Sequence, residues 1–430
     1  MLVGMPALDP TSPRPLPDGL VLRPARPSDL EQIGELLTAR GEEYDAEDHR
    51  LVVEDPAAGW ESCAVVVDGD RVVSTATLLD EELQLAVPGR DGEAVRLPAG
   101  QVELVATDPA FEGRGLVREL MGWAHALSEG RGHVLQVMIG IPYFYRLFGY
   151  SYAIDIPAHR PLSAPPVPDA LEGYAVRPAT TEDLPEVRRL QAAAQRAADL
   201  RMPHSPPRWQ WLLERHGSTT WVVERTDPGG GAPVVATGRT TPPQDDPVLA
   251  ELAATDQAAA TAMVAHAHQL AAAVEDPSPL VVWDRPGTVT GEVVDRLCGP
   301  APRQAEQYYV RVPDEVRLLD RLRPVLQARL AGASVDLPSE VVLSTFGRHV
   351  RMSLVEGELG SPRGGGTMQS PGVDGGAGVA PDQLGALLLG PHGIIGLSER
   401  HPDVYPGPHA DLMAALFPPV TADLLTYYLP

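Results

Sequence analysis

Residues 103–127, ELVATDPAFEGRGLVRELMGWAHAL, give the clearest indication of the fold in this sequence. It predicts a strand at 101–107, a turn at 113–115 and a helix at about 115–129. Glycine lets the backbone turn tightly and approach a ligand, and a helix start offers unpaired N–H groups with a favourable dipole. Gly113, Arg114 and Gly115 therefore predict a pyrophosphate-binding turn, although an ordinary turn uses the same residue types.

The elements around this stretch predict a mixed sheet with helices on both faces. A hairpin is expected at 63–79, turning at Asp68-Gly69-Asp70. A strand at 133–139, a short helix near 142–148 and a last strand from about 150 follow the glycine turn. The fold class is therefore α/β, with α+β character in its sheets.

The chain contains an internal repeat. GLVLRPARPSDLEQIGELL at 19–37 returns as GYAVRPATTEDLPEVRRLQ at 173–191, and ELVATD at 103–108 returns as ELAATD at 251–256. Each copy reads as a strand, a turn and an amphipathic helix. Two α/β domains of the same fold are therefore expected in tandem.

The rest of the chain predicts a third, different domain. At roughly 150 residues per domain, 430 residues predict about three domains. An amphipathic helix and alternating strands follow Val310, and the Gly-rich stretch 357–379 is expected to be a mobile surface loop.

The charge balance restricts the partners. The chain has 34 basic residues, all arginine, and 58 acidic residues, which gives a net charge of −24. Nucleic acids and anionic membranes require a basic face, so this balance disfavours both as partners. A cationic small molecule is the expected ligand.

The two cysteines and the termini point to a cytoplasmic protein without a metal. Cys63 and Cys298 lie in apolar stretches and cannot build a metal cluster, and they fit a reducing compartment. The Pro-rich start carries no signal-peptide core, and no run of 18 apolar residues follows.

The glycine turn resembles the acyl-CoA pyrophosphate loop of the GNAT acetyltransferase superfamily. That pattern is Gln or Arg, two residues, Gly, one residue, and Gly or Ala, and it falls on Glu112 to Val117 with Gly115 at its centre. Glu112 and Val117 depart from the pattern. The resemblance implies acetyl-CoA as co-substrate, with Val105 as backbone oxyanion donor and Thr107 beside the pantetheine arm. The residues expected to bind it are Val105, Thr107, Glu112, Gly113, Arg114, Gly115, Leu116, Val117 and Arg118.

The segment IPYFYRLFGYSYA, 141–153, resembles the short helix and strand of the same superfamily, where a tyrosine stands over the thioester sulfur. Tyr145 matches that tyrosine by its spacing from Phe148-Gly149-Tyr150. Its implied role is general acid toward the leaving CoA thiolate. Tyr143 and Phe144 are interpreted as packing aromatics.

The second copy lacks both features. Ala260, Thr261 and Met263 stand where the first copy has Glu112, Gly113 and Gly115, and Asp295 stands where it has Tyr145. The second copy is therefore expected to be non-catalytic.

The predicted order of domains is a catalytic GNAT-like copy, a non-catalytic copy and a different third domain. This order resembles the Eis (enhanced intracellular survival) family of N-acetyltransferases. That resemblance implies tandem GNAT-like domains, a C-terminal sterol-carrier-protein-like domain and a homo-oligomer, commonly a hexamer. The expected parts are a disordered tail at 1–18, a catalytic GNAT domain at 19–160, a Pro-rich linker at 161–172, a degenerate GNAT-like domain at 173–308 and the sterol-carrier-like domain at 309–430.

The general base is left open among the C-terminal carboxylate, Glu103 and water. The Eis resemblance implies the terminal carboxylate of Pro430, acting through water. The rival is Glu103, on the strand before the glycine turn, where some GNAT enzymes carry a catalytic glutamate. Its recurrence as Glu251 in the second copy favours a structural role instead.

The acceptor side is predicted from acidic residues. Glu42, Glu43 and Asp45 lie in the segment after the first helix, and the GNAT resemblance implies that this segment lines the acceptor cleft. A second acidic run lies at 80–82. Such a cluster attracts a cationic amine. A solvated acidic loop explains the same residues equally well.

The predicted function is transfer of an acetyl group from acetyl-CoA directly to a primary amine of a small, cationic acceptor, such as an aminoglycoside, a polyamine or a basic peptide. A non-catalytic lipid or acyl-CoA binder that uses the sterol-carrier-like domain is the alternative, and an acetyltransferase acting on proteins is a third possibility.

Overall fold

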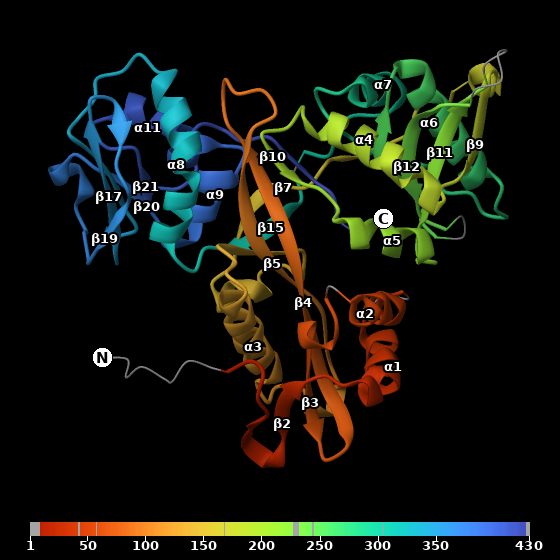
Figure 1. The fold of residues 1–430 in the computed structure, drawn as a ribbon, viewed down its shortest axis with the longest axis horizontal. Coiled ribbons are helices and arrows are strands. Elements are labelled where there is room, and N and C mark those ends of the chain that lie inside the picture. The colour runs from red at the N-terminus through yellow and green to blue at the C-terminus, as the bar shows by residue number, and fades with distance from the viewer. Residues whose placement is uncertain are drawn as a thin grey trace. The chain divides into compact units, whose positions relative to one another are not determined.

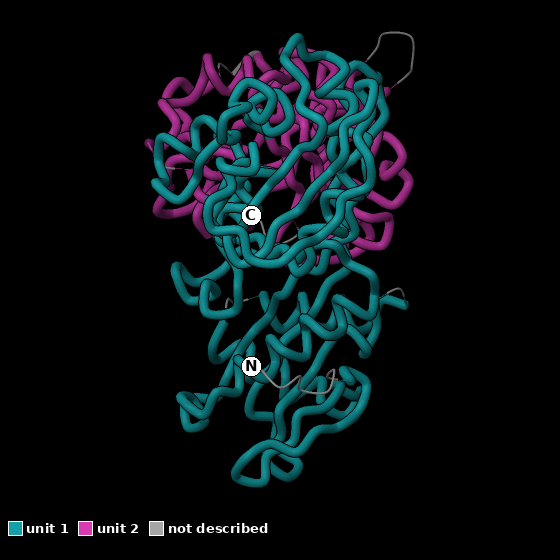
Figure 2. The backbone as a smooth tube through the Cα atoms, turned by 90° about the vertical axis from the view of Figure 1, so that its left-hand side faces the viewer, with its two compact units in different colours: residues 1–155, 307–421 teal, residues 156–306, 422–430 magenta. Residues whose placement is uncertain are grey.

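The computed structural model shows a chain of two compact units (Figure 2). The described residues are 9–41, 44–56, 58–166, 168–226, 232–242, 245–303 and 305–426. The first unit combines Met1–Asp155 with Gln307–Thr421, and the second combines Ile156–Glu306 with Ala422–Pro430. Each unit is therefore assembled from two segments that lie far apart in the sequence.

The first unit is built on a mixed sheet with the strand order β1-β2-β3-β4-β5-β6-β15-β7 (Figure 1). Its strands are β1 (Arg14–Pro15), β2 (Val21–Pro24), β3 (Cys63–Asp68), β4 (Arg71–Ala86), β5 (Ala94–Thr107), β6 (Leu135–Met138), β15 (Gln307–Arg311) and β7 (Ser151–Asp155). β5 and β6 run parallel, and the other neighbouring pairs in this order are antiparallel. The crossover that a parallel pair requires is made by α3 (Leu116–Gly130).

Helices cover both faces of this sheet. α1 (Leu30–Arg40) and α2 (Asp45–Glu54) lie on one side, and α3 lies on the other (Figure 1). β3 is buried from Cys63 to Val67, as expected of a strand covered on both faces. α1 buries Ile33, Leu36 and Leu37, which recur at helical spacing. The predicted α/β class with mixed sheets is confirmed.

The predicted disordered tail is wrong for residues 9–18. Arg14 and Pro15 pair with Leu22 and Val21 as strand β1. The indole N–H of Trp123 donates to the carbonyl of Pro10 at 3.0 Å. Proline is tolerated at a sheet edge because it needs no ladder donor there, so a Pro-rich segment can still be an ordered edge strand.

The boundaries between the repeated parts also differ from those predicted. β8 (His159–Pro161) pairs with β14 (Val281–Trp283) in the second unit's sheet, so that unit begins at Ile156 and not at 173. β15 follows the second copy in sequence but pairs with β6 and β7 of the first unit. The chain therefore crosses between sheets at 155/156 and 306/307, and the Pro-rich segment is not a simple linker.

The second unit repeats the architecture of the first. Its sheet has the order β8-β14-β13-β12-β11-β9, and β13 and β14 are parallel neighbours joined through α6, as β5 and β6 are joined through α3. The strands are β9 (Tyr174–Pro178), β11 (Thr219–Arg225), β12 (Val234–Thr240) and β13 (Val248–Ala254). The helices are α4 (Leu184–Gln195), α5 (Pro206–Glu214), α6 (Gln257–Ala272) and α7 (Val289–Leu297). This correspondence is consistent with tandem GNAT-like domains.

The remainder of the first unit is a separate sheet with helices. The sheet order is β18-β17-β16-β20-β21, and β19 pairs with β17. The strands are β16 (Glu340–Ser344), β17 (His349–Val355), β18 (Glu358–Leu359), β19 (Arg363–Gly365), β20 (Ala377–Val379) and β21 (Val404–Tyr405). The helices are α8 (Glu315–Ala331), α9 (Leu384–Leu389), α10 (Gly393–Ser398) and α11 (Ala410–Leu416). The Gly-rich stretch 357–379 thus contributes three strands and is not the loop that its composition predicts.

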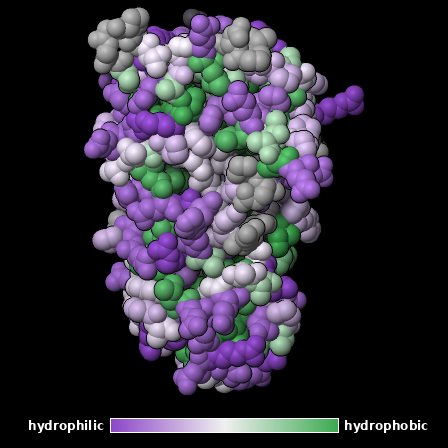
Figure 3. Space-filling view, turned by 90° about the vertical axis from the view of Figure 1, so that its right-hand side faces the viewer, coloured by the Kyte–Doolittle hydropathy of each residue, from purple (hydrophilic) through white to green (hydrophobic). Residues whose placement is uncertain are grey.

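The surface shows no large apolar face on the side drawn in Figure 3, where hydrophobic residues lie in small groups among hydrophilic ones. Scattered apolar residues of this kind are ordinary on protein surfaces. Among the described residues, no helix combines the length and the apolar character needed to cross a membrane.

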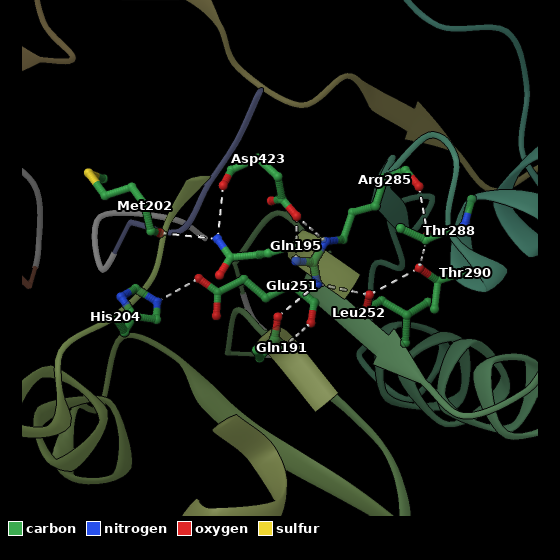
Figure 4. A network of polar contacts seen from close by, with 11 residues as sticks. Gln191, Gln195, Met202, His204, Glu251, Leu252, Arg285, Thr288, Thr290 and Asp423 are labelled. Carbon is green, nitrogen blue, oxygen red and sulfur yellow. Dashed lines mark hydrogen bonds and ion pairs between the residues drawn. The ribbon is translucent and has the colours of Figure 1, made fainter. Parts of the chain in front are cut away.

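A buried polar network ties the end of the chain to the second unit (Figure 4). β22 (Ala422–Leu424) pairs in parallel with β10 (Leu200–Met202). The Arg285 guanidinium donates to Asp423 Oδ2 from Nε at 2.9 Å and from Nη2 at 2.5 Å. Gln195 Nε2 donates to the carbonyl of Asp423 at 2.9 Å. The strand is therefore held by both its backbone and its one acidic side chain.

Glu251 lies at the centre of the same region. His204 Nε2 is 2.9 Å from Glu251 Oε1, and Arg239 Nη2 donates to that oxygen at 2.8 Å. Burial alone raises the pKa of Glu251, but the charge of Arg239 and the contacts with His204 outweigh it and lower the pKa to about 2. Arg239 also donates to the carbonyl of Thr426 at 2.6 Å, which extends the network to the last described residue.

We expect Asp423→Asn to destabilise the second unit by about 3–5 kcal/mol, because removing one partner of a buried ion pair leaves the other charge uncompensated. Four of the six tryptophans, Trp209, Trp211, Trp221 and Trp283, belong to this unit. Denaturant unfolding followed by tryptophan fluorescence therefore measures the effect.

The matched control is Glu186→Gln, which removes an exposed ion pair with Arg189 in the same unit. Exposed pairs of this kind contribute about 0–1 kcal/mol. Equal midpoints for the two variants would contradict a stabilising role for the Arg285–Asp423 pair.

Candidate active site

The site begins where two parallel strands separate. The register of β5 and β6 consists of Ala99 with Leu135, Gly100 with Gln136, and Gln101 with Val137. β5 continues to Thr107 along β4, whereas β6 pairs with β15 on its other side. The sheet therefore opens between β5 and β6 after Gln101, near the topological position where open α/β sheets bind ligands.

A β-bulge lies in β5 at this opening. Thr75 pairs with Ala106 and Thr77 pairs with Glu103, so Leu104 and Val105 together oppose one residue of β4. Leu104 has φ +53, a conformation that is costly for a branched side chain. Bulges re-aim side chains and interrupt the ladder, and they are common beside active sites.

The glycine loop, residues 112–117, follows the bulge. Asp108 accepts a hydrogen bond from the Ala110 N–H at 2.8 Å and caps the short 3₁₀ turn before the loop. Gly113 has φ +75 and Gly115 has φ +79, and α3 begins at Leu116. A Cβ at either glycine would meet no atom within 4 Å, so the positive φ, and not space, requires glycine. The loop thus presents its backbone at the positive end of the α3 dipole.

The glycine loop opens on a cavity of about 470 Å³. Predicted site residues on its wall are Val105, Thr107, Glu112, Gly113, Gly115, Leu116, Val117, Arg118 and Tyr145. Residues that were not predicted are Arg40, Phe111, Ile141, Phe144, Leu147 and Phe148. The structure therefore brings most of the predicted donor-binding residues around one space, which is mainly apolar with a charged rim.

Arg114 and Glu103, which were predicted on the donor and catalytic side, are not among the residues that line the cavity. The Arg114 guanidinium packs over the Phe111 ring at 4.7 Å and donates to the Ala110 carbonyl at 3.3 Å. Glu103 is buried on β5, where its Oε1 accepts a hydrogen bond from Gln101 Nε2 at 2.5 Å. Arg114 thus folds back on the loop, whereas Glu103 lies one residue before the bulge.

Tyr145 reaches the cavity from the short 3₁₀ helix Phe144–Phe148. Burial raises the pKa of its phenol to about 12, and the charges of Glu103 and Tyr309 act in the same direction. The phenol therefore stays protonated at neutral pH and keeps a proton available for donation. A Cβ on Gly140 would collide with the Tyr145 ring, so the ring depends on glycine at that position.

Tyr309 supports the turn that carries Tyr145. Its hydroxyl accepts a hydrogen bond from the Tyr143 N–H at 2.6 Å and donates to the Ile141 carbonyl at 3.4 Å. Tyr143 has φ +70, which the surrounding structure must hold in place. Sequence reasoning missed Tyr309 because β15 follows the second copy, and no local pattern shows that it returns to the first sheet.

Of the three predicted acceptor residues, one lies in the described part of the chain. Glu42 and Glu43 lie outside the described residues, and Asp45 is buried at the start of α2. The second acidic run begins at Asp80, whose Oδ1 accepts a hydrogen bond from Arg131 at 2.8 Å. That run lines a different cavity of about 700 Å³ with Arg131 and His133. Pro430 also lies outside the described residues.

The second copy builds no comparable loop. α6 begins at Gln257, directly after the capping residue Asp256, whereas seven residues separate Asp108 from α3. Ala260 and Met263 are buried inside α6, and Asp295 forms an ion pair with Arg160 at 2.5 Å. The described part of this copy therefore has a helix where the first copy has its glycine loop.

The strand register corrects the match between Glu103 and Glu251. In the second copy Thr237 pairs with Ala253 and Arg239 pairs with Ala250, so the bulge contains Glu251 and Leu252. Glu251 has φ +55 and is thus the counterpart of Leu104, not of Glu103. The structural counterpart of Glu103 is Ala250. The sequence repeat is offset by one residue here, and it gives no reason to call Glu103 structural.

Comparison with known proteins gives a family match for part of the chain. Residues 21–153 match a family model described as an acetyltransferase (GNAT) domain. A search of curated protein sequences found no match. Within the described residues, no three His, Cys, Asp or Glu side chains are grouped to hold a metal ion.

Solved structures show the same fold over almost the whole length. A GCN5-related N-acetyltransferase from Kribbella flavida is 18% identical with a TM-score of 0.61, covering 95% of this chain and 98% of that one. One from Anabaena variabilis is 13% identical with a TM-score of 0.62, covering 94% and 99%. Eis1 from Mycobacterium abscessus is 17% identical with a TM-score of 0.54, covering 94% and 98%. The chain thus has a GNAT-like fold, and the match of residues 21–153 to an acetyltransferase (GNAT) domain supports an acyltransferase.

Proposed function

We propose that the chain is an acetyl-CoA-dependent N-acetyltransferase that transfers the acetyl group directly to a primary amine of a small, cationic acceptor. The observation that carries this proposal is that the glycine loop and the Tyr145 phenol open on the same cavity of about 470 Å³, where β5 separates from β6. The features occur together in the copy that matches the acetyltransferase model.

The residues of the cavity fit the acyl donor. Gly113 and Gly115 allow the backbone to approach a diphosphate at the start of α3. The apolar wall formed by Phe111, Phe144 and Phe148 suits the uncharged pantetheine arm. The donor supplies the thioester, and the Val105 N–H at the bulge is assigned to the oxygen that becomes negatively charged during attack.

The chain must move two protons. An alkyl ammonium titrates near ~10.4, so a base has to take one proton before the amine can attack the thioester carbon. When the carbon–sulfur bond breaks, the sulfur takes the electron pair and accepts a proton from Tyr145. The acetyl group ends on nitrogen, which loses its second proton through water to the Tyr145 phenolate, and the base releases the first proton to water.

Glu103 is the better supported candidate for the base among described residues. Its charge contributes to the raised pKa of Tyr145, so the two groups lie within electrostatic range. The register shows that its counterpart in the second copy is Ala250, so the glutamate accompanies the glycine loop and Tyr145 in one copy only. The Pro430 carboxylate, acting through water, remains the alternative.

Turnover with acetyl-CoA across polyamines, aminoglycosides and cationic peptides tests the proposal. We expect acetylation of at least one class, and we expect Tyr145→Phe to lower kcat by about 10²-fold, the usual effect of losing a positioned acid. The matched control is Tyr150→Phe, which removes another buried phenol that contacts His125 instead.

Equal kcat for Tyr145→Phe and wild type would remove the general-acid role. The same preparation distinguishes the alternative function by calorimetry, because binding of fatty acids without binding of CoA would favour a lipid-binding protein.

We further expect Gly140→Ala to lower kcat by roughly 10- to 100-fold with little change in KM for acetyl-CoA, because the new Cβ displaces the Tyr145 ring. Gly122→Ala on α3 is the control, since a Cβ there meets no atom within 4 Å. If displacement of Tyr145 is the cause, Gly140→Ala has no further effect on kcat in the Tyr145→Phe background. Additive losses would show a different cause.

A further inference from the structure

The glycine loop carries a negative charge where the proposed donor is most negative. Glu112 occupies the position at which the GNAT pattern has Gln or Arg, and its side chain lies on the wall of the 470 Å³ cavity. Its side chain is 53% exposed, so it remains accessible from the cavity mouth. A carboxylate near a diphosphate weakens binding through like-charge repulsion unless a cation compensates it.

The compensating cation comes from another element. Arg40 lies in the last turn of α1, 72 residues before Glu112 in the sequence. Arg40 Nη2 donates to Glu112 Oε1 at 2.5 Å, and Arg40 itself lines the cavity. Arg40 of α1 thus places a positive charge beside position 112, where the loop itself carries a carboxylate.

The other arginines near the loop are arranged differently. Arg114 packs over the Phe111 ring at 4.7 Å and is not part of the cavity wall. Arg118 does line the cavity, but its guanidinium lies 5.5 Å from the centre of the Phe148 ring, one turn into α3. Arg40 is therefore the arginine paired with the loop at the residue where its sequence departs from the GNAT pattern.

We propose that Arg40 binds the diphosphate of the acyl-CoA donor and that Glu112 orients it. This inference rests on the proposed function. A guanidinium has five N–H donors in a rigid fork, so it can engage one carboxylate oxygen and a phosphate oxygen together. Glu112 thereby acts through Arg40 as a positioning residue, and the local charge of the pair is zero before the donor binds.

The experiment measures CoA binding by calorimetry for wild type, Arg40→Ala, Glu112→Gln and the double variant. We expect Arg40→Ala to weaken CoA binding by about tenfold, the effect of one charge-assisted contact. Glu112→Gln should bind CoA at least as tightly as wild type, because the amide oxygen can still accept the hydrogen bond that orients Arg40 while the negative charge is removed from the loop. The double variant should bind more tightly than Arg40→Ala alone.

A second ligand separates the phosphates of CoA. With 3′-dephospho-CoA, the loss caused by Arg40→Ala should be the same as with CoA, because the diphosphate is present in both. A loss that disappears with 3′-dephospho-CoA would place Arg40 at the 3′-phosphate and overturn the assignment.

The matched control is Arg50→Ala on α2, which removes an arginine that is similarly exposed and similarly paired, with Glu54 at 2.8 Å. Exposed ion pairs contribute little to stability, so both arginine variants should unfold at the wild-type temperature. Equal CoA affinity for Arg40→Ala and Arg50→Ala would overturn this inference alone. Failure of the wild-type protein to bind CoA would overturn the proposed function as well.

Discussion

The candidate active site depends on the interruption of the β5 ladder after Gln101. From Ala99 to Gln101 β5 is paired on both sides, and beyond Gln101 the β6 side is open while the β4 side is broken by the bulge at Leu104 and Val105. An unpaired strand edge inside a sheet normally costs free energy, because each backbone N–H and C=O needs a partner. In a donor-binding enzyme these groups are available to the ligand. The cavity, the glycine loop and the Tyr145 turn all surround this opening.

The second copy contains the same bulge but starts its helix without a glycine loop. Comparing the two copies therefore separates the bulge from the other features of the candidate site. Both copies contain the bulge, and in both a residue with a side chain takes a positive φ there. The second copy, however, starts α6 at once and fills the adjacent interior with Glu251, Arg239 and His204. Buried charges of this kind are stable only when each one is compensated by a partner. The network also holds β22, so this copy uses the position for architecture.

Sequence patterns identified the local features of the site and missed those that depend on distant pairing. Gly113 and Gly115 follow from the strand–turn–helix pattern, since only glycine readily adopts the required φ. Tyr309 and Arg40 act from β15 and α1, and their contacts arise from strand order and helix packing that no short window of sequence contains. The same limitation explains the one-residue error at Glu251. The sequence repeat matches Glu103 with Glu251 because the letters are identical. The backbone matches Leu104 with Glu251, because the bulge lies one residue earlier in the second repeat and a shift of this kind leaves the composition unchanged.

The net charge of −24 is a weaker constraint on the donor than it first seems. At physiological ionic strength the Debye length is about 8 Å, so exposed carboxylates far from the glycine loop are largely screened from a bound diphosphate. The groups that matter are those on the cavity wall. Among the described residues of that wall, the one carboxylate, Glu112, is paired with Arg40, Arg118 adds a positive charge, and the α3 N-terminus adds its dipole. These described groups are together positive although the chain as a whole is acidic, so the overall charge does not prevent an anionic donor from binding at the loop.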